Sequence, residues 1–218
     1  MLRELKLMGI TLTDKAVVRS RENIPPIIRQ AITASDLVFV LLADDPHTDR
    51  IVCESICNAL GLVPKLHIPT KETLVAHYKA LGKVPSQVQL SRAMLPQGCT
   101  PFPNEKGVQP SYALSSKKKL VIVLPGSKKE LYPIFLSEIL PLLESLSPKP
   151  VASHLLSCYG LTAQDAETQL GSLLNSSNPI VTVYPMGNST AVRVTACSST
   201  EKQAKDSALF AVKTVGAR

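Results

Sequence analysis

The sequence predicts an α/β protein with a wound sheet, followed by a small α+β unit. Two apolar runs with the length of a buried strand, residues 37–42 and 119–124, lie between turn residues, and each precedes a helical pattern. Six consecutive apolar residues at 37–42 are typical of a strand that is covered on both faces. With 218 residues, 44% of them apolar, the chain can form one large and one small domain.

Apolar periodicity and turn residues predict the elements of the larger domain. We first expect a helix over 2–8 that Gly9 ends, an extended stretch at 16–19, a helix from the cap Asn23 to Ala34 with Pro25 and Pro26 in its first turn, the strand 37–42, the loop 43–49 and a helix 50–60 that Gly61 ends. We then expect a helix 70–81 that Thr70 caps and Gly82 ends, a loop 96–110, the strand 119–124, and a helix 130–146 that Pro133 and Pro141 interrupt.

A proline-containing linker, Ser147-Pro148-Lys149-Pro150, separates the two predicted domains, which we place at residues 1–146 and 147–218. The smaller domain is expected to form one sheet covered by helices. Its expected elements are a strand 151–157, a helix 162–174 that Thr162 and Asp165 begin, a strand 180–184, a turn 187–188, a strand 191–196 and a helix 201–215.

Charge and hydropathy limit the partners and the location of the chain. The formal net charge is +7, and the excess gathers at Lys117–Lys119 and at Lys128 and Lys129. These lysines fit either a solvated turn or a rim that attracts phosphate. Nucleic-acid binding is not expected, because aromatic residues are only 4% and none lies within the lysine clusters. The sequence also lacks a signal peptide and a membrane-length apolar run, so a cytoplasmic location without membrane contact is expected.

The five cysteines favour reduced thiols over a disulfide framework, because their number is odd and they are scattered. Cys53 and Cys57 are four residues apart and share a helix face. They fit either buried apolar side chains or half of a metal site, but no second pair of ligands with the spacing of a zinc site occurs.

Two loops follow the predicted strands and precede helices, which is where wound α/β folds bind ligands. They span residues 43–49 and 125–129. The first holds Asp44, Asp45 and Asp49 beside His47 and Thr48. These carboxylates would repel a phosphate directly, whereas a divalent cation would bridge carboxylate and phosphate oxygens. In the alternative, Asp45 or Thr48 caps the helix and the other side chains are solvated.

Several stretches, in order, resemble the competence/damage-inducible CinA family. They are Ser35-Asp36-Leu37-Val38 with Ala59-Leu60-Gly61, Met94 to Gly98 with Asn104 to Pro110, Leu124-Pro125-Gly126 to Leu131, and, after the linker, Tyr159-Gly160-Leu161 with Asn178 to Val181 and Val192 to Ala196. The resemblance implies a three-layer αβα fold like the molybdopterin-binding proteins MogA and MoaB, followed by a small KH-like α+β domain.

The resemblance also implies a binding site and an activity. Members of this type hydrolyse the pyrophosphate of ADP-ribose-like nucleotides with a divalent metal, Mg²⁺, Mn²⁺ or Co²⁺. Ligand contacts would come from Asn104, Gly107, Pro125, Gly126 and Glu130, and the metal would be held by Asp49 and Asp45.

The chain also departs from the family pattern. Residues 1–10 match only the end of the family's first long helix, so the first strand and its acidic motif are expected to be missing, and nothing matches the deamidase domain. The family's phosphate-turn glycines are replaced by Leu42-Ala43 and by Asp44-Asp45, and Arg50 replaces an acidic residue. Glycine lets a backbone approach a phosphate closely, and side chains obstruct that approach.

Two functions therefore stay open. In the first, the chain binds a phosphate-containing nucleotide or pterin, or a partner chain, with weak or lost catalysis. In the second, it is a metal-dependent nucleotide pyrophosphatase. The KH-like domain has only one glycine in 187–190, where KH domains use a GxxG loop to bind RNA. We expect it to bind no specific RNA and to support packing or a homodimer.

Overall fold

The computed structural model describes residues 2–8, 10, 12–186 and 189–216 of the chain. The chain forms two compact units. One comprises Ala16–Ile134 and is called the 16–134 unit below; the other comprises Met1–Lys15 with Phe135–Arg218 and is called the second unit. These bounds differ from those of the predicted domains, 1–146 and 147–218. The division into domains between residues 146 and 147 stays a prediction.

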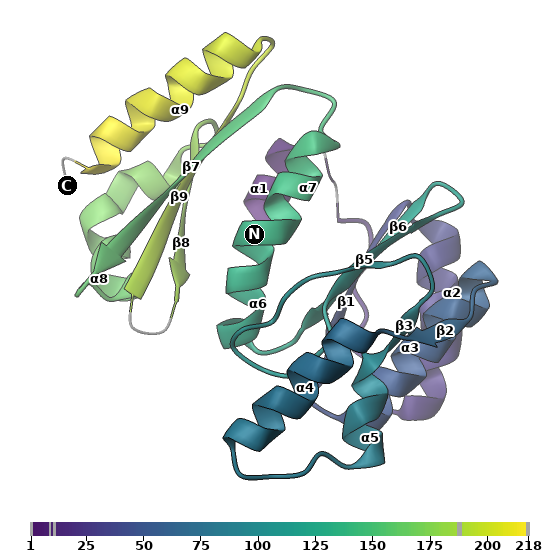
Figure 1. Ribbon diagram of the computed structural model, residues 1–218. Helices are drawn as coiled ribbons and strands as arrows, with labels where there is room; N and C mark the ends of the chain where they lie inside the picture. The colour runs from purple at the N-terminus through teal and green to yellow at the C-terminus, as the bar shows by residue number, and fades with distance from the viewer. Residues whose placement is uncertain (1, 9, 11, 187–188, 217–218) are drawn as a thin grey trace. The chain divides into compact units, whose positions relative to one another are not determined.

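A mixed four-stranded sheet forms the centre of the 16–134 unit (Figure 1), with the strand order β1-β6-β5-β4. Strand β1 (Leu37–Leu42) runs parallel to β6 (Lys119–Pro125), whereas β5 (Tyr112–Ser116) and β4 (Thr100–Pro101) continue the sheet antiparallel. The two apolar runs of the sequence thus become hydrogen-bonded neighbours, and their carboxyl ends meet at one edge of the sheet.

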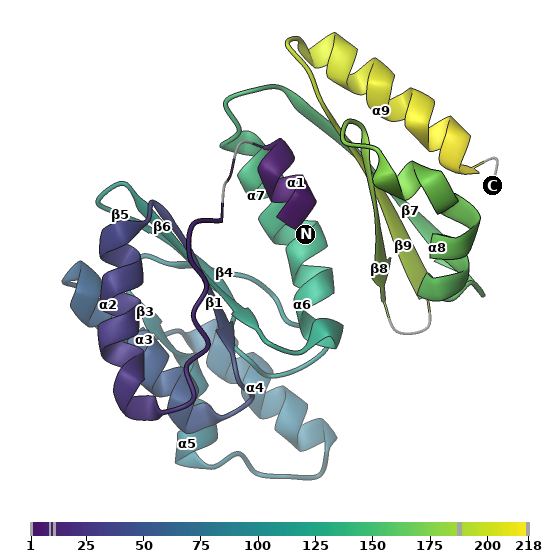
Figure 2. The same ribbon diagram turned by 180° about the vertical axis from the view of Figure 1, so that it is seen from behind.

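Helices cover both faces of this sheet. Helices α2 (Ile24–Ala34) and α3 (Pro46–Leu60) lie on one side, and α6 (Lys128–Ile134) lies on the other (Figures 1 and 2). The core between sheet, α2 and α3 consists of buried aliphatic side chains and Tyr112. The predicted α/β fold class is therefore confirmed.

The remaining elements of the 16–134 unit are short or peripheral. They are η1 (Arg21–Asn23), β2 (Pro64–Leu66), which pairs antiparallel with β3 (Met94–Pro96), and the helical segments α4 (Ile68–Ala80), α5 (Gln87–Leu90) and η2 (Ser91–Ala93).

The second unit contains an antiparallel sheet with the order β7-β9-β8. Its elements are α1 (Leu2–Leu7), the π-helical η3 (Phe135–Ile139), α7 (Leu140–Ser145), β7 (Val151–Tyr159), α8 (Ala163–Leu170), η4 (Gly171–Asn175), β8 (Ile180–Pro185), β9 (Ser189–Cys197) and α9 (Glu201–Gly216). Arg193 of β9 is buried and donates hydrogen bonds to Glu144 and Ser153, so a compensated charge lies within this unit. One sheet covered by helices agrees with the predicted α+β pattern.

Three predicted helix starts are wrong, and one of them, predicted at residue 130, lies at Lys128 of α6 in the structure. Helix α3 begins at Pro46 rather than at residue 50, because the Asp45 carboxylate caps it and Pro46 fits the first turn. Helix α4 begins at Ile68 rather than after Thr70, because His67 is the capping residue. The predicted stops at Gly61 and Gly82 agree with the structure, since α3 ends at Leu60 and α4 ends before Gly82.

Other expectations are corrected in part. Strand β1 is an edge strand in which Leu41 is 53% exposed, so it is not covered on both faces. Residues 16–19 form no regular element, and Asn23 precedes α2 without a capping bond from its side chain. The interrupted helix 130–146 is present as α6, η3 and α7. Gly9 and the turn 187–188 lie outside the described residues. Among the described helices, none is long and apolar enough to cross a membrane.

Candidate functional site

The two predicted ligand loops lie together at the edge of the sheet where β1 and β6 end. Leu42, the last residue of β1, is in register with Pro125, the last residue of β6. Helix α3 follows the first strand and helix α6 follows the second, so both loops lead from a strand into a helix, as the sequence predicts.

Gly126 is required by the neighbouring strand. A β-carbon at Gly126 would lie 2.2 Å from the carbonyl oxygen of Leu42, which is far inside van der Waals contact. Pro125 is buried, whereas residues 126–129 are exposed. Glycine at this position therefore has a structural cause, in addition to any role in admitting a phosphate.

Three residues expected to contact a ligand come together. The amide nitrogen of Asn104 donates to Glu130 Oε2 at 2.7 Å and to the carbonyl oxygen of Gln109 at 3.0 Å. A β-carbon at Gly107 would lie 2.0 Å from the same Glu130 oxygen. A hydrogen bond thus connects the loop of Asn104 and Gly107 to the start of α6. The Glu130 carboxylate fills the space that a side chain at position 107 would need.

Gln109 is a residue of this loop that the sequence did not single out for a role. It is 2% exposed, and neither its side-chain oxygen nor its nitrogen has a hydrogen-bond partner within the described part of the chain. Nothing in the sequence pattern distinguishes it from the other polar residues of the loop.

Asp45 acts as the N-cap of α3. Its carboxylate accepts hydrogen bonds from the backbone amides of His47 and Thr48, from the Thr48 hydroxyl, and from Arg21 at 2.7 Å. These bonds, the one from the Thr48 hydroxyl above all, lower the pKa of Asp45 to about 2. A carboxylate of the chain therefore already occupies the anion-binding start of this helix.

Asp49 forms a buried ion pair with Arg92, another residue for which the sequence indicated no role. Arg92 Nε donates to Asp49 Oδ2 at 2.8 Å, and Arg92 Nη2 donates to Asp44 Oδ1 at 2.9 Å. Burial outweighs the attraction of the guanidinium and raises the pKa of Asp49 to about 6. No motif marks Arg92, because its partners lie 43 and 48 positions away in the sequence.

A small cavity adjoins this ion pair. Its volume is about 10 Å³, and Asp49, Arg92, Cys53 and Tyr112 are among the residues that line it. A cavity needs roughly 10–15 Å³ to hold one water molecule. The second carboxylate oxygen of Asp49, Oδ1, is buried without a partner in the described structure, and one water in this space would satisfy it.

The expected metal donors do not fit a divalent cation in this arrangement. Asp45 is bonded to Arg21 and Asp49 to Arg92, so each carboxylate already has a positively charged partner. Within the described ranges, no group of three or more His, Cys, Asp and Glu side chains could hold a metal. Cys53 donates to the carbonyl oxygen of Met94, and burial raises the pKa of its thiol well above the usual range. It is thus a buried thiol rather than a thiolate ligand.

The first lysine cluster lies away from the candidate site. Lys119 Nζ donates to the carbonyl oxygen of Ser35 at 3.0 Å and to Asp36 Oδ1 at 3.2 Å, so it stabilises the carboxyl end of α2. Lys117 and Lys118 form the β5–β6 turn with positive φ angles of 50° and 63°.

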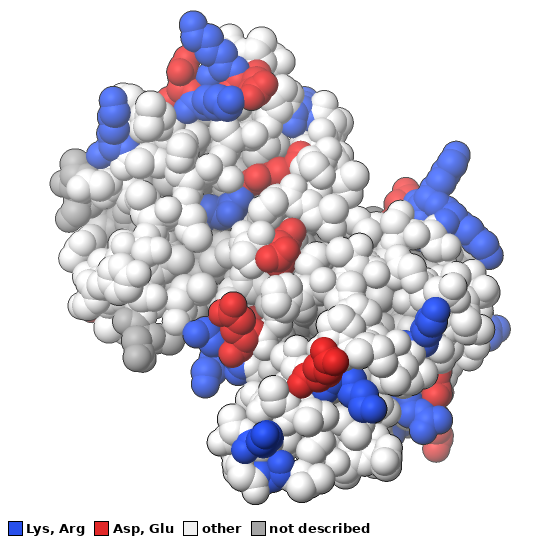
Figure 3. All heavy atoms as spheres, viewed as in Figure 1, with Lys and Arg blue, Asp and Glu red and all other residues white. Residues whose placement is uncertain are grey.

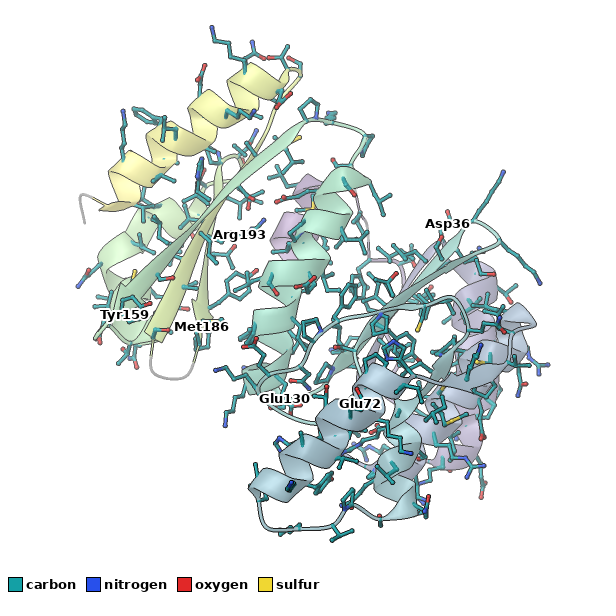
Figure 4. The ribbon with its side chains drawn as sticks, viewed as in Figure 1. Asp36, Glu72, Glu130, Tyr159, Met186 and Arg193 are labelled. Atoms are coloured by element: carbon teal, nitrogen blue, oxygen red, sulfur yellow. The ribbon has the colours of Figure 1, made fainter. Side chains whose placement is uncertain are left out.

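The two lysine clusters belong to different ends of the sheet. Asp36 and Glu130 lie at opposite ends of the 16–134 unit (Figure 4). On the face drawn in Figure 3, the basic side chains stand in separate groups and not in one continuous patch. Lys128 and Lys129, which begin α6, are the lysines of the two clusters that stand at the carboxyl ends of the strands.

The comparisons with known proteins agree with the resemblance seen in the motifs. No protein-family model matches the chain. A competence-damage inducible protein of Thermoanaerobacter pseudethanolicus is 27% identical over 201 residues, which are 92% of this chain and 49% of that protein. One of Clostridium acetobutylicum is 27% identical over 206 residues, 93% of this chain and 50% of that protein.

A solved structure, the protein CinA from Thermoplasma acidophilum, matches 54% of this chain and 69% of its own chain, with a TM-score of 0.46 and 24% identity. The chain spans about half the length of the curated relatives it matches. Over nearly its whole length, then, this chain is similar to the competence-damage inducible proteins of the CinA family.

Proposed function

We propose that the chain binds a phosphate-bearing small molecule, a nucleotide or a pterin, where β1 and β6 end, and that its catalysis is weak or absent. The observation that carries the proposal is the hydrogen bond from Asn104 to Glu130, with Gly107 packed against that carboxylate, on the segment that follows the exposed turn at Gly126. These residues come from the loop of Asn104 and from the first turn of α6, and they meet at the edge where wound α/β folds bind ligands.

The charges of the site suggest how such a ligand would lie. The Glu130 carboxylate repels a phosphate and accepts hydrogen bonds from hydroxyl or N–H groups, so it suits the sugar or base end of a ligand. Lys128 and Lys129 are exposed at the start of α6, and their ammonium groups suit the phosphate end. The two kinds of group belong to one segment, because Glu130 directly follows Lys128 and Lys129 in the sequence.

The bonds of the acidic loop support binding without turnover. A metal-dependent pyrophosphatase needs carboxylates that are free to hold a divalent ion close to the phosphates. Here the carboxylates of Asp45 and Asp49 are bonded to Arg21 and Arg92. The assignments as a MogA-like and a KH-like domain remain part of this proposal.

Calorimetric titration with ADP-ribose and with ADP tests the proposal. We expect Lys128→Asn/Lys129→Asn to weaken binding at least about tenfold, which corresponds to roughly 1.4 kcal/mol. The matched control is Lys117→Asn/Lys118→Asn, which removes the same charge at the far end of the sheet and places Asn at two positions with positive φ. Equal affinity of both double variants, or no binding by the wild type, would contradict the proposed site.

Phosphate release from ADP-ribose with Mg²⁺, Mn²⁺ or Co²⁺ distinguishes binding from hydrolysis. We expect no turnover above a small fraction of ordinary enzyme rates of about 1–10³ per second. Turnover in that range, abolished by Asp49→Ala, would establish the pyrophosphatase instead.

A further inference from the structure

Arg92 lies between the acidic side chains that follow strand β1. It donates to Asp49 at 2.8 Å from Nε and to Asp44 at 2.9 Å from Nη2. The side chains of Arg92 and Asp49 are 3% and 1% exposed, whereas that of Asp44 is 76% exposed. A single guanidinium therefore neutralises a buried carboxylate and also reaches out to an exposed one.

A divalent cation at this loop would need the same two carboxylates. Mg²⁺ binds carboxylate oxygens at about 2.0–2.1 Å, so an ion shared by Asp44 and Asp49 would lie in the space that the guanidinium fills. Arginine stays protonated in proteins and has no lone pair to offer a metal. A cation and the Arg92 guanidinium would also repel each other at this distance, so one excludes the other.

The unpartnered oxygen of Asp49 does not call for a metal. The adjoining cavity of about 10 Å³ has room for about one water molecule, and a water with one or two further polar contacts satisfies a carboxylate oxygen. Asp45, the third carboxylate near this position, is already engaged, since it bonds Arg21 and caps α3. The carboxylates at this position therefore all have arginine partners, and too few oxygen atoms are left to coordinate a metal ion.

We infer that Arg92 takes the place of a divalent cation between Asp44 and Asp49, as a permanent counter-ion supplied by the chain. The loop then needs no metal to keep its carboxylates in position, and it binds none. Removing the guanidinium would leave the buried Asp49 carboxylate without a counter-charge, and a divalent cation would then be bound in its place. The inference does not depend on the phosphate ligand proposed above, because the ion pair lies wholly within the chain.

The experiment compares thermal unfolding with and without millimolar Mn²⁺ near neutral pH. We expect the Tm of the wild type to be unchanged by Mn²⁺. Arg92→Gln should unfold at a lower temperature, and Mn²⁺ should raise its Tm by at least about 2–4 °C, the shift that roughly 1 kcal/mol of binding produces in a chain of this size. Adding Asp49→Asn to Arg92→Gln should abolish that response.

Arg50→Gln is the matched control. Arg50 is next to Asp49 in the sequence, but it is exposed and pairs with Glu54 at 2.7 Å. Its loss should leave the protein insensitive to Mn²⁺, so a response confined to the Arg92 variant would identify the guanidinium between the two aspartates as the cause.

Two results would overturn the inference. One is a Mn²⁺-dependent rise in the Tm of the wild type that Asp49→Asn removes, since metal and Arg92 would then bind together. The other is a folded Arg92→Gln protein that does not respond to Mn²⁺. If Arg92→Gln does not fold, counting bound Mn²⁺ on the wild type by electron paramagnetic resonance decides the question: none supports the inference, and one ion per chain that Asp49→Asn abolishes overturns it.

Discussion

Gly126 lies against the carbonyl oxygen of Leu42 so closely that a β-carbon would come within 2.2 Å of it. The last residue of β1 and the turn after β6 are 84 positions apart in sequence, yet the backbone of Leu42 excludes a side chain at position 126. The oxygen belongs to the backbone of a strand that is hydrogen-bonded to its neighbour, so it cannot move aside as a flexible side chain could.

Gly126→Ala should therefore destabilise the protein by about 1–3 kcal/mol, the range for an added group that a packed site cannot accept. Urea unfolding measures the change. Gly216→Ala is the control, because a β-carbon there meets nothing within 4 Å, and we expect a change below about 0.5 kcal/mol. A Gly126→Ala protein as stable as the wild type would show that the two strands separate easily.

Asn104→Asp should destabilise the loop in a pH-dependent way. The substitution places a second carboxylate within hydrogen-bond distance of Glu130, where the native amide donates at 2.7 Å. Like charges raise the pKa of such a pair in the folded state, so its contribution to stability is present at low pH and is lost as the pH rises through the raised pKa. We expect the loss in unfolding free energy to be greater at pH 8 than at pH 5. Asn104→Ala, which adds no charge, should show no such dependence.

Asp49 should make the stability of the wild type depend on pH. Burial raises its pKa to about 6, so its contribution is complete below the ordinary carboxyl pKa and declines as the pH rises through about 6. Compared with Asp49→Asn, the wild type should therefore gain unfolding free energy as the pH falls from 7 to 4. The measurement is urea unfolding of both proteins across this range. If the unfolding free energies of the two proteins changed with pH in the same way, the pKa of Asp49 would not be raised.

Asp45→Ala should cost about 1 kcal/mol, the usual value for removing an N-cap side chain. Asp45→Asn should cost less, because asparagine caps helices about as well and only the exposed pair with Arg21 is lost. Thermal unfolding distinguishes the two variants. If Asn were as harmful as Ala, the charge of Asp45 and not its capping bonds would be responsible.

The full chain should not bind specific RNA. The expectation comes from the single glycine in 187–190, where a KH domain needs a GxxG loop to hold the nucleotide backbone. Gel-shift assays with single-stranded RNA at physiological salt test it. A sequence-dependent shift at sub-micromolar protein would contradict it, whereas a shift that salt removes would report the net charge of +7.

Much of the fold could be predicted from the sequence, because the signals are local. Strands β1 and β6 are runs of apolar residues between turns, and the end of α3 at Leu60 is marked by a glycine that can adopt a positive φ. The start of α3 is also local. The alternative in which Asp45 caps the helix is confirmed, and the first helical residue is Pro46 instead of residue 50.

Only the tertiary structure decided which side chains and backbone atoms contact one another in the candidate site. The sequence by itself determined that Asn104, Gly107, Gly126 and Glu130 follow a family-like pattern and that acidic residues follow β1. It could not show that Glu130 covers Gly107, that Leu42 excludes a side chain at Gly126, or that Arg92 neutralises Asp49. The physical reason is that periodicity and capping depend on residues within a few positions of one another. Burial of a charge or a close backbone approach depends on which distant segments the sheet brings together.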